Sequence, residues 1–413
     1  MLDLERITEV ANKINLLPLK FFVITVAGTN GKGSTVAILD SILRQKNLRV
    51  GRYMSPYLYA YNEQISVNGL DVSNQELCEV FEYIEKSRGS VVLTEFEFCT
   101  LAALIIFAKS NIDIAILEVG LGGRLDATNI VDADIAVITS VDIDHTAWLG
   151  HTREEIAKEK SGIMRSNKPV IFGEENIPLS LKNHAKNLSA CLYSQGVNFG
   201  FKKNIDTQDS QNTWDWYCEE IKLLNLPCPS HLLIQNASTA LMALRLLGQV
   251  SEYLKISEEN IREGLKQVYL SGRLESVLID NQIDNQYEII LDVAHNPHAA
   301  RVLAERLEVK KNTGKTYAVF SVLADKDLPG IVRSMKNYIH EWHIAPLKTE
   351  RAMNLLDLKK GMKEAGAAAY FEYETIAEAY MKLKERLKER LGAEDRIIVF
   401  GSFYCVREVS ACI

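Results

Sequence analysis

The stretch Phe21-Phe22-Val23-Ile24-Thr25-Val26-Ala27, followed directly by Gly28-Thr29-Asn30-Gly31-Lys32-Gly33-Ser34-Thr35, decides the fold. Its first part is apolar or β-branched, which is typical of a strand buried on both faces of a parallel sheet. Its second part contains three glycines, and apolar residues then recur at helical spacing from Ser34 to Gln45. A buried strand, a glycine-rich turn and a helix in this order indicate an α/β domain that binds a phosphorylated ligand.

The glycine-rich turn has the chemistry of a triphosphate-binding loop. Glycines let the backbone curl so that its N–H groups converge on one point, where the helix N-terminus adds its positive dipole end. Lys32 can reach the β- and γ-phosphates, and Ser34 or Thr35 can place a hydroxyl near Mg²⁺. We predict that ATP is bound by Gly28, Thr29, Asn30, Gly31, Lys32, Gly33, Ser34 and Thr35.

The spacing of this loop is unusual and leaves two alternatives. Two residues, rather than the usual four, separate its first glycine from the Gly-Lys pair. The turn can be a plain strand–helix connection whose lysine is accidental. It can also be a dinucleotide loop, but the G-x-G-x-x-G pattern of such loops does not occur there.

The composition excludes several classes of protein. The 413 residues are 47% hydrophobic and 24% charged with a net charge of −7, so the chain is neither disordered nor generally attracted to nucleic acid or anionic membranes. The longest apolar run, Phe98 to Ala108, is too short to cross a bilayer, and the N-terminus lacks the order of a signal peptide. We therefore expect a cytosolic protein that binds neither nucleic acid nor membrane, with seven reduced cysteines.

Short β-rich runs alternate with helical patterns in two parts of the chain, which predicts two parallel α/β domains. In the first part we expect strands at 21–27, 48–54, 114–117, 135–139 and 169–172, and helices at 34–45, 75–86, 98–109, 153–162, 237–247 and 258–268. In the second part we expect strands at 288–291, 316–320, 341–345, 368–373 and 396–400, and helices at 297–307 and 376–391.

The boundary between the two domains is expected at 269–272. Residues 1–270 would form the P-loop nucleotide-binding domain with a central, mostly parallel sheet, and residues 271–413 a smaller Rossmann-like α/β domain. We expect the active site in the cleft between them. Residues 197–230, which include Trp214 and Trp216, fit no α/β unit, and we expect short, irregular strands there.

Glu118 is a further candidate metal ligand, and two other side chains follow it in the chain. Glu118 ends an apolar strand, and in α/β proteins the carboxyl ends of buried strands face the ligand, so Glu118 is well placed to hold Mg²⁺. His145 follows the next strand, and Lys160 lies on the helix after it. Taken alone, His145 is more simply a turn or core residue and Lys160 a surface lysine in a salt bridge.

Several motifs resemble those of the Mur-ligase superfamily. Besides the loop they include Glu118 to Asn129 (EVGLGGRLDATN), Gly272-Arg273-Leu274-Glu275 and Leu291 to His298 (LDVAHNPH). The resemblance covers Val26 to Tyr404 and is closest to the bacterial bifunctional dihydrofolate synthases/folylpolyglutamate synthases. It implies an ATP-dependent ligase that adds L-glutamate to dihydropteroate and to the γ-carboxylate of reduced folates through an acyl phosphate.

The resemblance also implies the site, residue by residue. Two Mg²⁺ ions would be held by Ser55, Glu118, His145 and Lys160, with Lys160 carbamylated to an anion. The pterin would contact Thr94, Glu95, Phe96, Glu97, Leu125, Asp126 and Ala127. ATP would further contact Asn236, Arg273 and Asp292, and the catalytic residues would be Lys32, Lys160, His295 and Ser402, the last two placing the incoming glutamate.

The residues themselves leave simpler alternatives open at some of these positions. Phe96 can be a core residue, Glu95 and Glu97 can be charges at the start of a helix, and Asn236 can be a helix N-cap.

The sequence also departs from the family pattern. Tyr57 replaces a His, Gln64 replaces an Arg, and Leu270-Ser271 replaces Trp-Pro. The loop lies closer to the start of the chain than in the family, so we expect a shortened start.

Other functions share the triphosphate loop. A kinase or ATPase would turn over ATP without glutamate, and a nucleotide sensor would bind ATP without turnover. A monofunctional folylpolyglutamate synthase or another Mur-type amide ligase would differ only in the acceptor. Nothing in the sequence requires more than one copy, so we expect a monomer that acts on small molecules.

Overall fold

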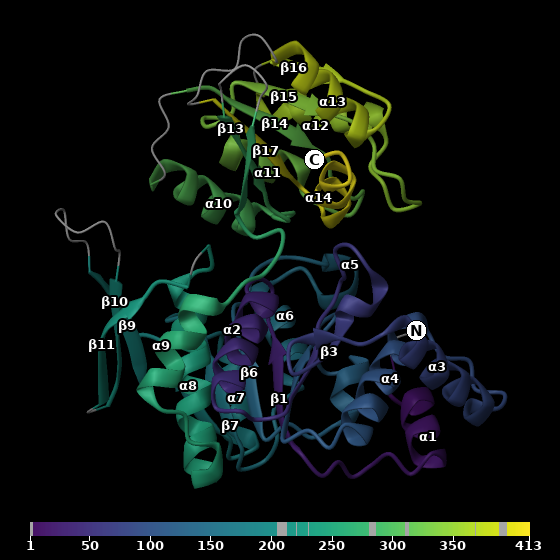
Figure 1. The fold of residues 1–413 in the computed structure, drawn as a ribbon, viewed down its shortest axis with the longest axis vertical. Coiled ribbons are helices and arrows are strands. Elements are labelled where there is room, and N and C mark those ends of the chain that lie inside the picture. The colour runs from purple at the N-terminus through teal and green to yellow at the C-terminus, as the bar shows by residue number, and fades with distance from the viewer. Residues whose placement is uncertain are drawn as a thin grey trace. The chain divides into compact units, whose positions relative to one another are not determined.

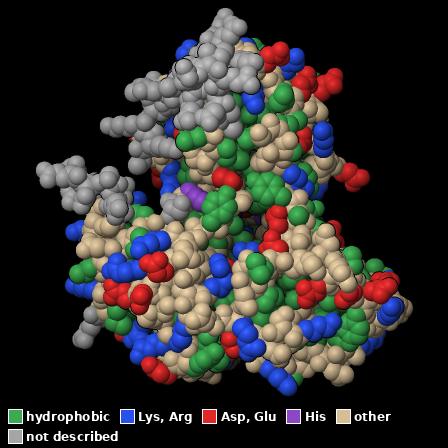
Figure 2. Space-filling model, viewed as in Figure 1, with side chains coloured by type: hydrophobic (Ala, Val, Ile, Leu, Met, Phe, Trp, Pro, Cys, Tyr) green, Lys and Arg blue, Asp and Glu red, His purple; other side chains and the backbone are tan. Residues whose placement is uncertain are grey.

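A computed structural model describes residues 3–204, 213–219, 221–229, 231–280, 286–309, 314–367, 369–387 and 395–413. The chain forms two compact units, Met1–Leu270 and Ser271–Ile413. No helix in the described part of the chain is both long enough and apolar enough to cross a membrane. Figure 2 shows acidic and basic side chains interspersed over the displayed face of each unit.

The first unit is built on an eight-stranded sheet with the order β4-β3-β2-β5-β1-β6-β7-β8. Figure 1 labels β1, β3, β6 and β7 of this sheet. Its strands are β1 (Phe22–Ala27), β2 (Val50–Tyr53), β3 (Ile65–Val67), β4 (Leu70–Asp71), β5 (Ile114–Glu118), β6 (Ile135–Ile138), β7 (Pro169–Phe172) and β8 (Cys191–Ser194). The strands from β2 to β8 in this order pair in parallel, and only β3 and β4 pair antiparallel at one edge. The prediction of an α/β fold with a mostly parallel central sheet is confirmed.

Helices cover both faces of this sheet because successive strand residues point to opposite sides. In β1, Ile24 and Val26 pack in one core with α2 and α8, whereas Val23 packs in another with α1, α3 and α4. The helices are α1 (Glu5–Lys13), α2 (Lys32–Gln45), α3 (Asn74–Arg88), α4 (Glu95–Lys109), α5 (Thr146–Leu149), α6 (Arg153–Ser161), α7 (Leu179–Asn187), α8 (Ile234–Val250) and α9 (Glu258–Gln267), with the 3-10 helices η1 (Tyr61–Gln64), η2 (Ala127–Ile130) and η3 (Glu252–Leu254).

The structure corrects the expectation of short, irregular strands at residues 197–230. Instead of irregular strands they form an antiparallel sheet of β9 (Phe199–Asn204), β10 (Thr213–Cys218) and β11 (Ile221–Pro227) beside α8 (Figure 1). The reason is a period of two: Trp214, Trp216 and Cys218 alternate along β10, and all three are buried in the core that contains α8. Residues 205–212, 220 and 230 of the segment lie outside the described residues.

The second unit has a six-stranded sheet with the order β12-β13-β17-β14-β15-β16. Its strands are β12 (Glu275–Asp280), β13 (Gln286–Leu291), β14 (Thr316–Phe320), β15 (Glu341–Ile344), β16 (Ala369–Glu372) and β17 (Arg396–Phe400). Among the strands that the structure describes in this unit, only β12 pairs antiparallel. An aromatic core of Phe320, Trp342 and Phe400, with ring centroids 4.8 to 5.9 Å apart, lies on one face.

The helices of the second unit alternate with its strands. They are α10 (Pro297–Val309), α11 (Leu328–Met335), α12 (Leu355–Ala365), α13 (Ile376–Leu387) and α14 (Phe403–Ser410). Residues of α10, α11 and α12 pack on the aromatic core, while α13 and α14 contact each other and the sheet. The expected helix 376–391 is found as far as Leu387, and its residues 388–391 lie outside the described part.

Candidate active site

Four neighbouring strands of the first unit carry the predicted site segments at their carboxyl ends. The strands β2, β5, β1 and β6 lie side by side and run parallel, so these ends meet at one edge of the sheet. Ser55 follows β2, Glu118 ends β5 beside Val26 of β1, the glycine-rich loop follows β1, and His145 follows β6. Parallel α/β sheets bind their ligands at this edge.

The end of β6 holds the glycine-rich loop in place. Thr29 N donates to Ser140 O (2.9 Å) and Asn30 N donates to Ser140 Oγ (3.0 Å), while Thr139 Oγ1 donates to Asn30 O (2.6 Å). Gly28 has φ +152°, and a Cβ atom there would overlap Thr139 Oγ1. The sequence did not single out Thr139 or Ser140. Their position at the end of an expected strand was the available signal, but the sequence does not predict which strand neighbours β1.

Asn236 borders the loop from the first turn of α8. Gly31, the N-cap of α2, has φ +85°, and a Cβ atom there would come 2.5 Å from Asn236 Oδ1. The N-cap of α8 is Leu233, so the N-cap alternative for Asn236 is wrong. The structure therefore brings this predicted nucleotide residue directly against the loop.

Two lysines meet at the carbonyl oxygen of Gly28. Lys32 Nζ donates to this oxygen at 3.1 Å and Lys160 Nζ donates to it at 3.0 Å. Lys160 is only 3% exposed, so the alternative of a surface lysine is wrong. Burial and then the positive charge of Lys32 lower the pKa of Lys160 to about 7. A sizeable fraction of this amine is therefore neutral near neutral pH.

The residues around Glu118 fit a magnesium ion. A Cβ atom on Gly33 would lie 3.6 Å from Glu118 Oε2 and 3.3 Å from Met54 Cε, so the glycine leaves space between α2 and the carboxylate. Thr35 Oγ1, on the same helix, is buried and neither accepts nor donates a hydrogen bond among the described residues. A carboxylate and a hydroxyl are oxygen donors of the kind that Mg²⁺ prefers.

His145 occupies the turn before α5. Its φ is +51°, and its Nε2 lies 4.0 Å from Asp144 Oδ2. Across the described ranges, no three His, Cys, Asp or Glu side chains are grouped as a metal site. The predicted ligand set would not form such a group of three, because only Glu118 and His145 are of these residue types. Ser55 and a modified Lys160 would supply the other donors.

The predicted pterin segment begins α4. Thr94 is the N-cap: its Oγ1 accepts from Glu97 N (3.2 Å), and its own N donates to Glu97 Oε2 (2.7 Å). Glu97 Oε1 pairs with Arg6 at 3.0 Å. Because both oxygens of buried Glu97 are engaged within the chain, the structure favours the alternative of a helix-start charge for Glu97. Glu95 is exposed.

Phe96 lies against the loop that follows β5. A Cβ atom on Gly120 would come 2.7 Å from Phe96 Cζ, and the rings of Phe96 and Tyr53 are 5.8 Å apart. Asp126 is buried and accepts hydrogen bonds from Thr128 Oγ1 (2.7 Å) and from Leu121 N (2.9 Å). Phe96 and the stretch around Asp126 thus come together, with Tyr53 as a neighbour that the sequence did not indicate.

In the second unit, Asp292 and Arg273 lie near each other at the end of β13. Asp292 accepts from Leu274 N (2.9 Å) and Ala294 N (2.7 Å). Burial raises the pKa of Asp292, and the positive charge of Arg273 is the largest influence that opposes this rise. The hydrogen bond from Leu274 N to Asp292 therefore connects the start of the second unit to the carboxyl end of its sheet.

His295 and Ser402 follow the adjacent strands β13 and β17. His295 Nδ1 lies 2.8 Å from Val293 O, and its ring centroid lies 6.4 Å from that of Phe403. Ser402 is the N-cap of α14 and its Oγ accepts from Tyr404 N (3.3 Å). The structure thus places these two residues at one edge of the second sheet.

Comparisons with known proteins show the family of this chain. The family model "Mur ligase middle domain" matches residues 26–244, and "Mur ligase, glutamate ligase domain" matches residues 272–403. The dihydrofolate synthase/folylpolyglutamate synthase of Escherichia coli (strain K12) is 40% identical over 413 residues, which cover 100% of this chain and 91% of that protein. The chain belongs to the dihydrofolate synthase/folylpolyglutamate synthase family of Mur ligases.

Other members of this family are similar over the same length. The relative from Buchnera aphidicola subsp. Schizaphis graminum (strain Sg) is 41% identical over 97% of this chain and 90% of its own. The structure of E. coli FolC in complex with DHPP and ADP has a TM-score of 0.88 at 38% identity, covering 100% of this chain and 93% of that one. A bifunctional folylpolyglutamate synthase/dihydrofolate synthase with Mn, AMPPNP and L-glutamate bound also has a TM-score of 0.88, at 40% identity, covering 100% and 94%.

Proposed function

We propose that this chain is an ATP-dependent ligase that joins L-glutamate to dihydropteroate, forming dihydrofolate, and to the γ-carboxylate of reduced folates, forming folylpolyglutamates. The observation that carries the proposal is the meeting of the triphosphate loop, Glu118 and buried Lys160 at one sheet edge, in a chain 40% identical over its whole length to an enzyme of that name. The acceptor carboxylate takes the γ-phosphoryl group of ATP, and the amine of glutamate then displaces phosphate from the acyl phosphate.

The chain contributes mainly positioning and charge neutralisation. Glycine N–H groups at the start of α2 and the ammonium of Lys32 cradle the phosphates. In the second unit we assign Arg273 and Asp292 to ATP, and His295 and Ser402 to the incoming glutamate. The phenyl ring of Phe96, against the loop of Asp126, offers an apolar face on which a pterin can stack.

Magnesium would supply positive charge that offsets the developing charge on the transferred phosphoryl group. Glu118, Ser55, His145 and the hydroxyl of Ser34 or Thr35 are the residues that would hold it. We further propose that Lys160 carries a carbamate. Its burial and its pKa of about 7 support this, because only a neutral amine can attack carbon dioxide.

ADP release tests the function. Purified protein with ATP and Mg²⁺ is given dihydropteroate and L-glutamate, with each omitted in turn, and Lys32→Ala is the background control. We expect ADP only when both are present. ADP formation that does not depend on glutamate would indicate a kinase or ATPase. Turnover with reduced folates but not with dihydropteroate would indicate a monofunctional folylpolyglutamate synthase.

The carbamate has its own test. Lys160→Ala should lower turnover by about 100-fold or more, because the site loses an anion that no other residue replaces. A short carboxylic acid such as acetate should restore part of it. Lys158→Ala, an exposed lysine on the same helix, is the matched control and should be unchanged. A lack of rescue, together with an intact mass that shows no added carbon dioxide on the native protein, would contradict the carbamate.

We propose that the enzyme acts as a monomer. Light scattering of the eluting protein should give the mass of one chain with and without ATP.

A further inference from the structure

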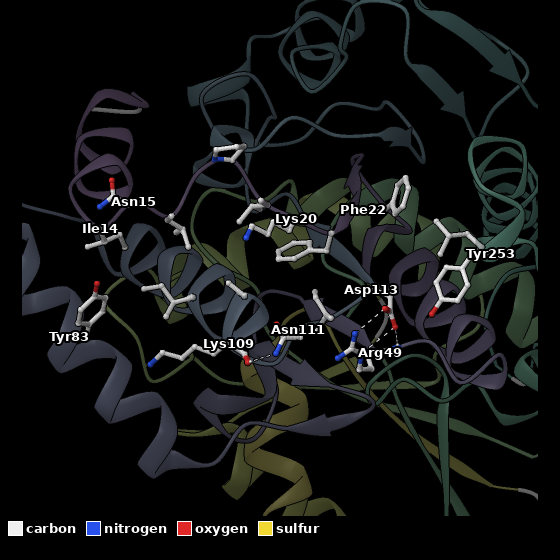
Figure 3. Close-up of a pocket in the computed structure, with 18 residues that line it drawn as sticks. Ile14, Asn15, Lys20, Phe22, Arg49, Tyr83, Lys109, Asn111, Asp113 and Tyr253 are labelled. Carbon is white, nitrogen blue, oxygen red and sulfur yellow. Dashed lines mark hydrogen bonds and ion pairs between the residues drawn. The ribbon is translucent and has the colours of Figure 1, made fainter.

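The first unit has a cavity at the opposite edge of its sheet from the nucleotide loop (Figure 3). It lies at the amino ends of β1 and β5, where Phe22 and Asp113 line it, and its volume is about 730 Å³. β1 is six residues long, so its two ends are roughly 17–20 Å apart. The cavity is therefore separate from the site at the carboxyl ends, and its size is that of a small-molecule site, about 300–1,000 Å³.

The cavity has an apolar wall and an aromatic ring at each of two opposite ends. Ile105, Ile112 and Leu254 line it and are buried. Figure 3 shows Tyr83 and Tyr253 at opposite ends of the cavity, and these residues are 44% and 60% exposed. A flat apolar molecule could therefore cover aromatic surface that now faces water.

The charged side chains of the cavity leave a positive surplus. Arg49 is matched by Asp113, with Nη2 3.3 Å from Oδ1 and the Arg49 backbone N 2.8 Å from Oδ2. Lys20 and Lys109 also line the cavity, and both are exposed. Lys109 Nζ lies 6.0 Å from the centroid of the Tyr83 ring, so a cation and an aromatic face stand together at one end. This surplus of two positive charges occurs in a protein of net charge −7.

We propose that this cavity binds a small aromatic anion. The ring system lies along the apolar wall between the two tyrosines, and the anionic group lies against Lys20 and Lys109. Complementarity decides the class of ligand. A neutral aromatic molecule gains nothing from the charge of the two lysines, and a small inorganic anion leaves the apolar wall in water.

The test uses the full chain and the fluorescent aromatic anion anilinonaphthalenesulfonate. We expect saturable binding at one site that saturating ATP and Mg²⁺ do not displace. Lys20→Ala/Lys109→Ala should weaken binding at least about fivefold, since each exposed charge contributes modestly. Lys86→Ala/Lys182→Ala removes the same charge from exposed positions outside the cavity and should bind like the native protein.

Competition defines the chemistry of the ligand. Naphthoate should displace the probe, whereas naphthamide, which has the same shape without the charge, and acetate should not at equal concentration. Equal weakening in the two double variants, displacement by ATP, or competition by naphthamide as strong as by naphthoate would each overturn the proposal. All substituted lysines are exposed, and an unchanged melting temperature verifies that each variant is folded.

Discussion

Lys160 illustrates how a residue's surroundings set its chemistry. For an exposed lysine, with a pKa of about 10.4, only about one amine in a thousand is neutral near pH 7.4. Burial beside Lys32 lowers the pKa of Lys160 to about 7. The motif around Lys160 could be matched in the sequence, but its burial could not, because burial arises from the packing of α6 against a loop 132 positions away.

Gly31 is needed both for the positive φ of the loop backbone and for the space beside Asn236. Gly31→Ala must place a side chain at φ +85° and within 2.5 Å of Asn236 Oδ1. We expect it to lower the free energy of unfolding by about 2 kcal/mol and to weaken ATP binding, measured by urea unfolding and calorimetric titration.

Gly89→Ala is the matched control for this change. Gly89 also has a positive φ, of +62°, but a Cβ atom there would meet nothing within 4 Å. It should carry only the backbone cost and leave ATP binding unchanged. Equal ATP affinity in the two variants would contradict the contact between Gly31 and Asn236.

We predict that acid lowers the stability of the second unit, because His343 is buried there. It is fully buried on β15, its Nδ1 lies 2.9 Å from the Tyr373 hydroxyl oxygen, and burial followed by the charge of Arg386 lowers its pKa to about 3. The unfolded chain takes up a proton below about pH 6.5, while the folded chain does not until about pH 3. The stability that neutral His343 contributes is therefore present above pH 6.5 and lost as the pH falls, with a slope of at most about 1.4 kcal/mol per pH unit.

Hydrogen exchange of β15 peptides between pH 7.5 and 4.5 measures this dependence after correction for the intrinsic exchange rate. His343→Gln should have a shallower dependence than the native chain. His151→Gln, which changes an exposed histidine of the other unit, should leave it unaltered. Identical slopes for His343→Gln and the native chain would refute the assignment.

At the scale of elements, the start of α4 carries two carboxylates with different expected roles. Glu97 is structural, and Glu95 is available to a ligand. Glu97→Gln removes the charge that pairs with Arg6, while its amide oxygen can still accept from Thr94 N, so we expect a loss of at most about 1 kcal/mol in the free energy of unfolding with little change in KM for dihydropteroate. Glu95→Gln, two residues earlier and exposed, should leave stability unchanged and raise KM for dihydropteroate. Thermal melting and steady-state kinetics on both variants decide between them, and the reverse pattern would show that Glu97 contacts the pterin.

Elements with strong local signals could be predicted, and those without them could not. β7, β14 and β17 lie where the apolar runs indicate, because strands buried on both faces read as continuous apolar stretches. The sequence does not predict α1 or the edge strand β8, since α1 has few apolar residues and β8 (Cys191–Ser194) is not a continuous apolar run. Trp214 and Trp216 alternate with polar Asp215 and with Tyr217, and this period of two is the sequence signal of β10.

At the scale of the whole molecule, strand order decides which residues meet. The loop after β1 touches Thr139 and Ser140 only because β6 is the neighbour of β1, and Glu118 faces α2 because β5 lies between β2 and β1. The order of these strands along the sequence predicts neither of these pairs of neighbours. Family resemblance supplied most of the candidate site, whereas Glu97 and Asp126 show that a residue in a family motif can be occupied in holding the loop or helix itself.

The central claim is that a carboxylate receives the terminal phosphoryl group of ATP. Dihydropteroate labelled with oxygen-18 in its carboxyl group, incubated with the enzyme, ATP, Mg²⁺ and L-glutamate, tests it directly. Attack of the carboxylate on phosphorus and loss of phosphate to the amine must transfer one labelled oxygen to inorganic phosphate, which mass spectrometry detects. Labelled phosphate formed in step with dihydrofolate is the predicted result. Dihydrofolate formed alongside unlabelled phosphate would contradict the account.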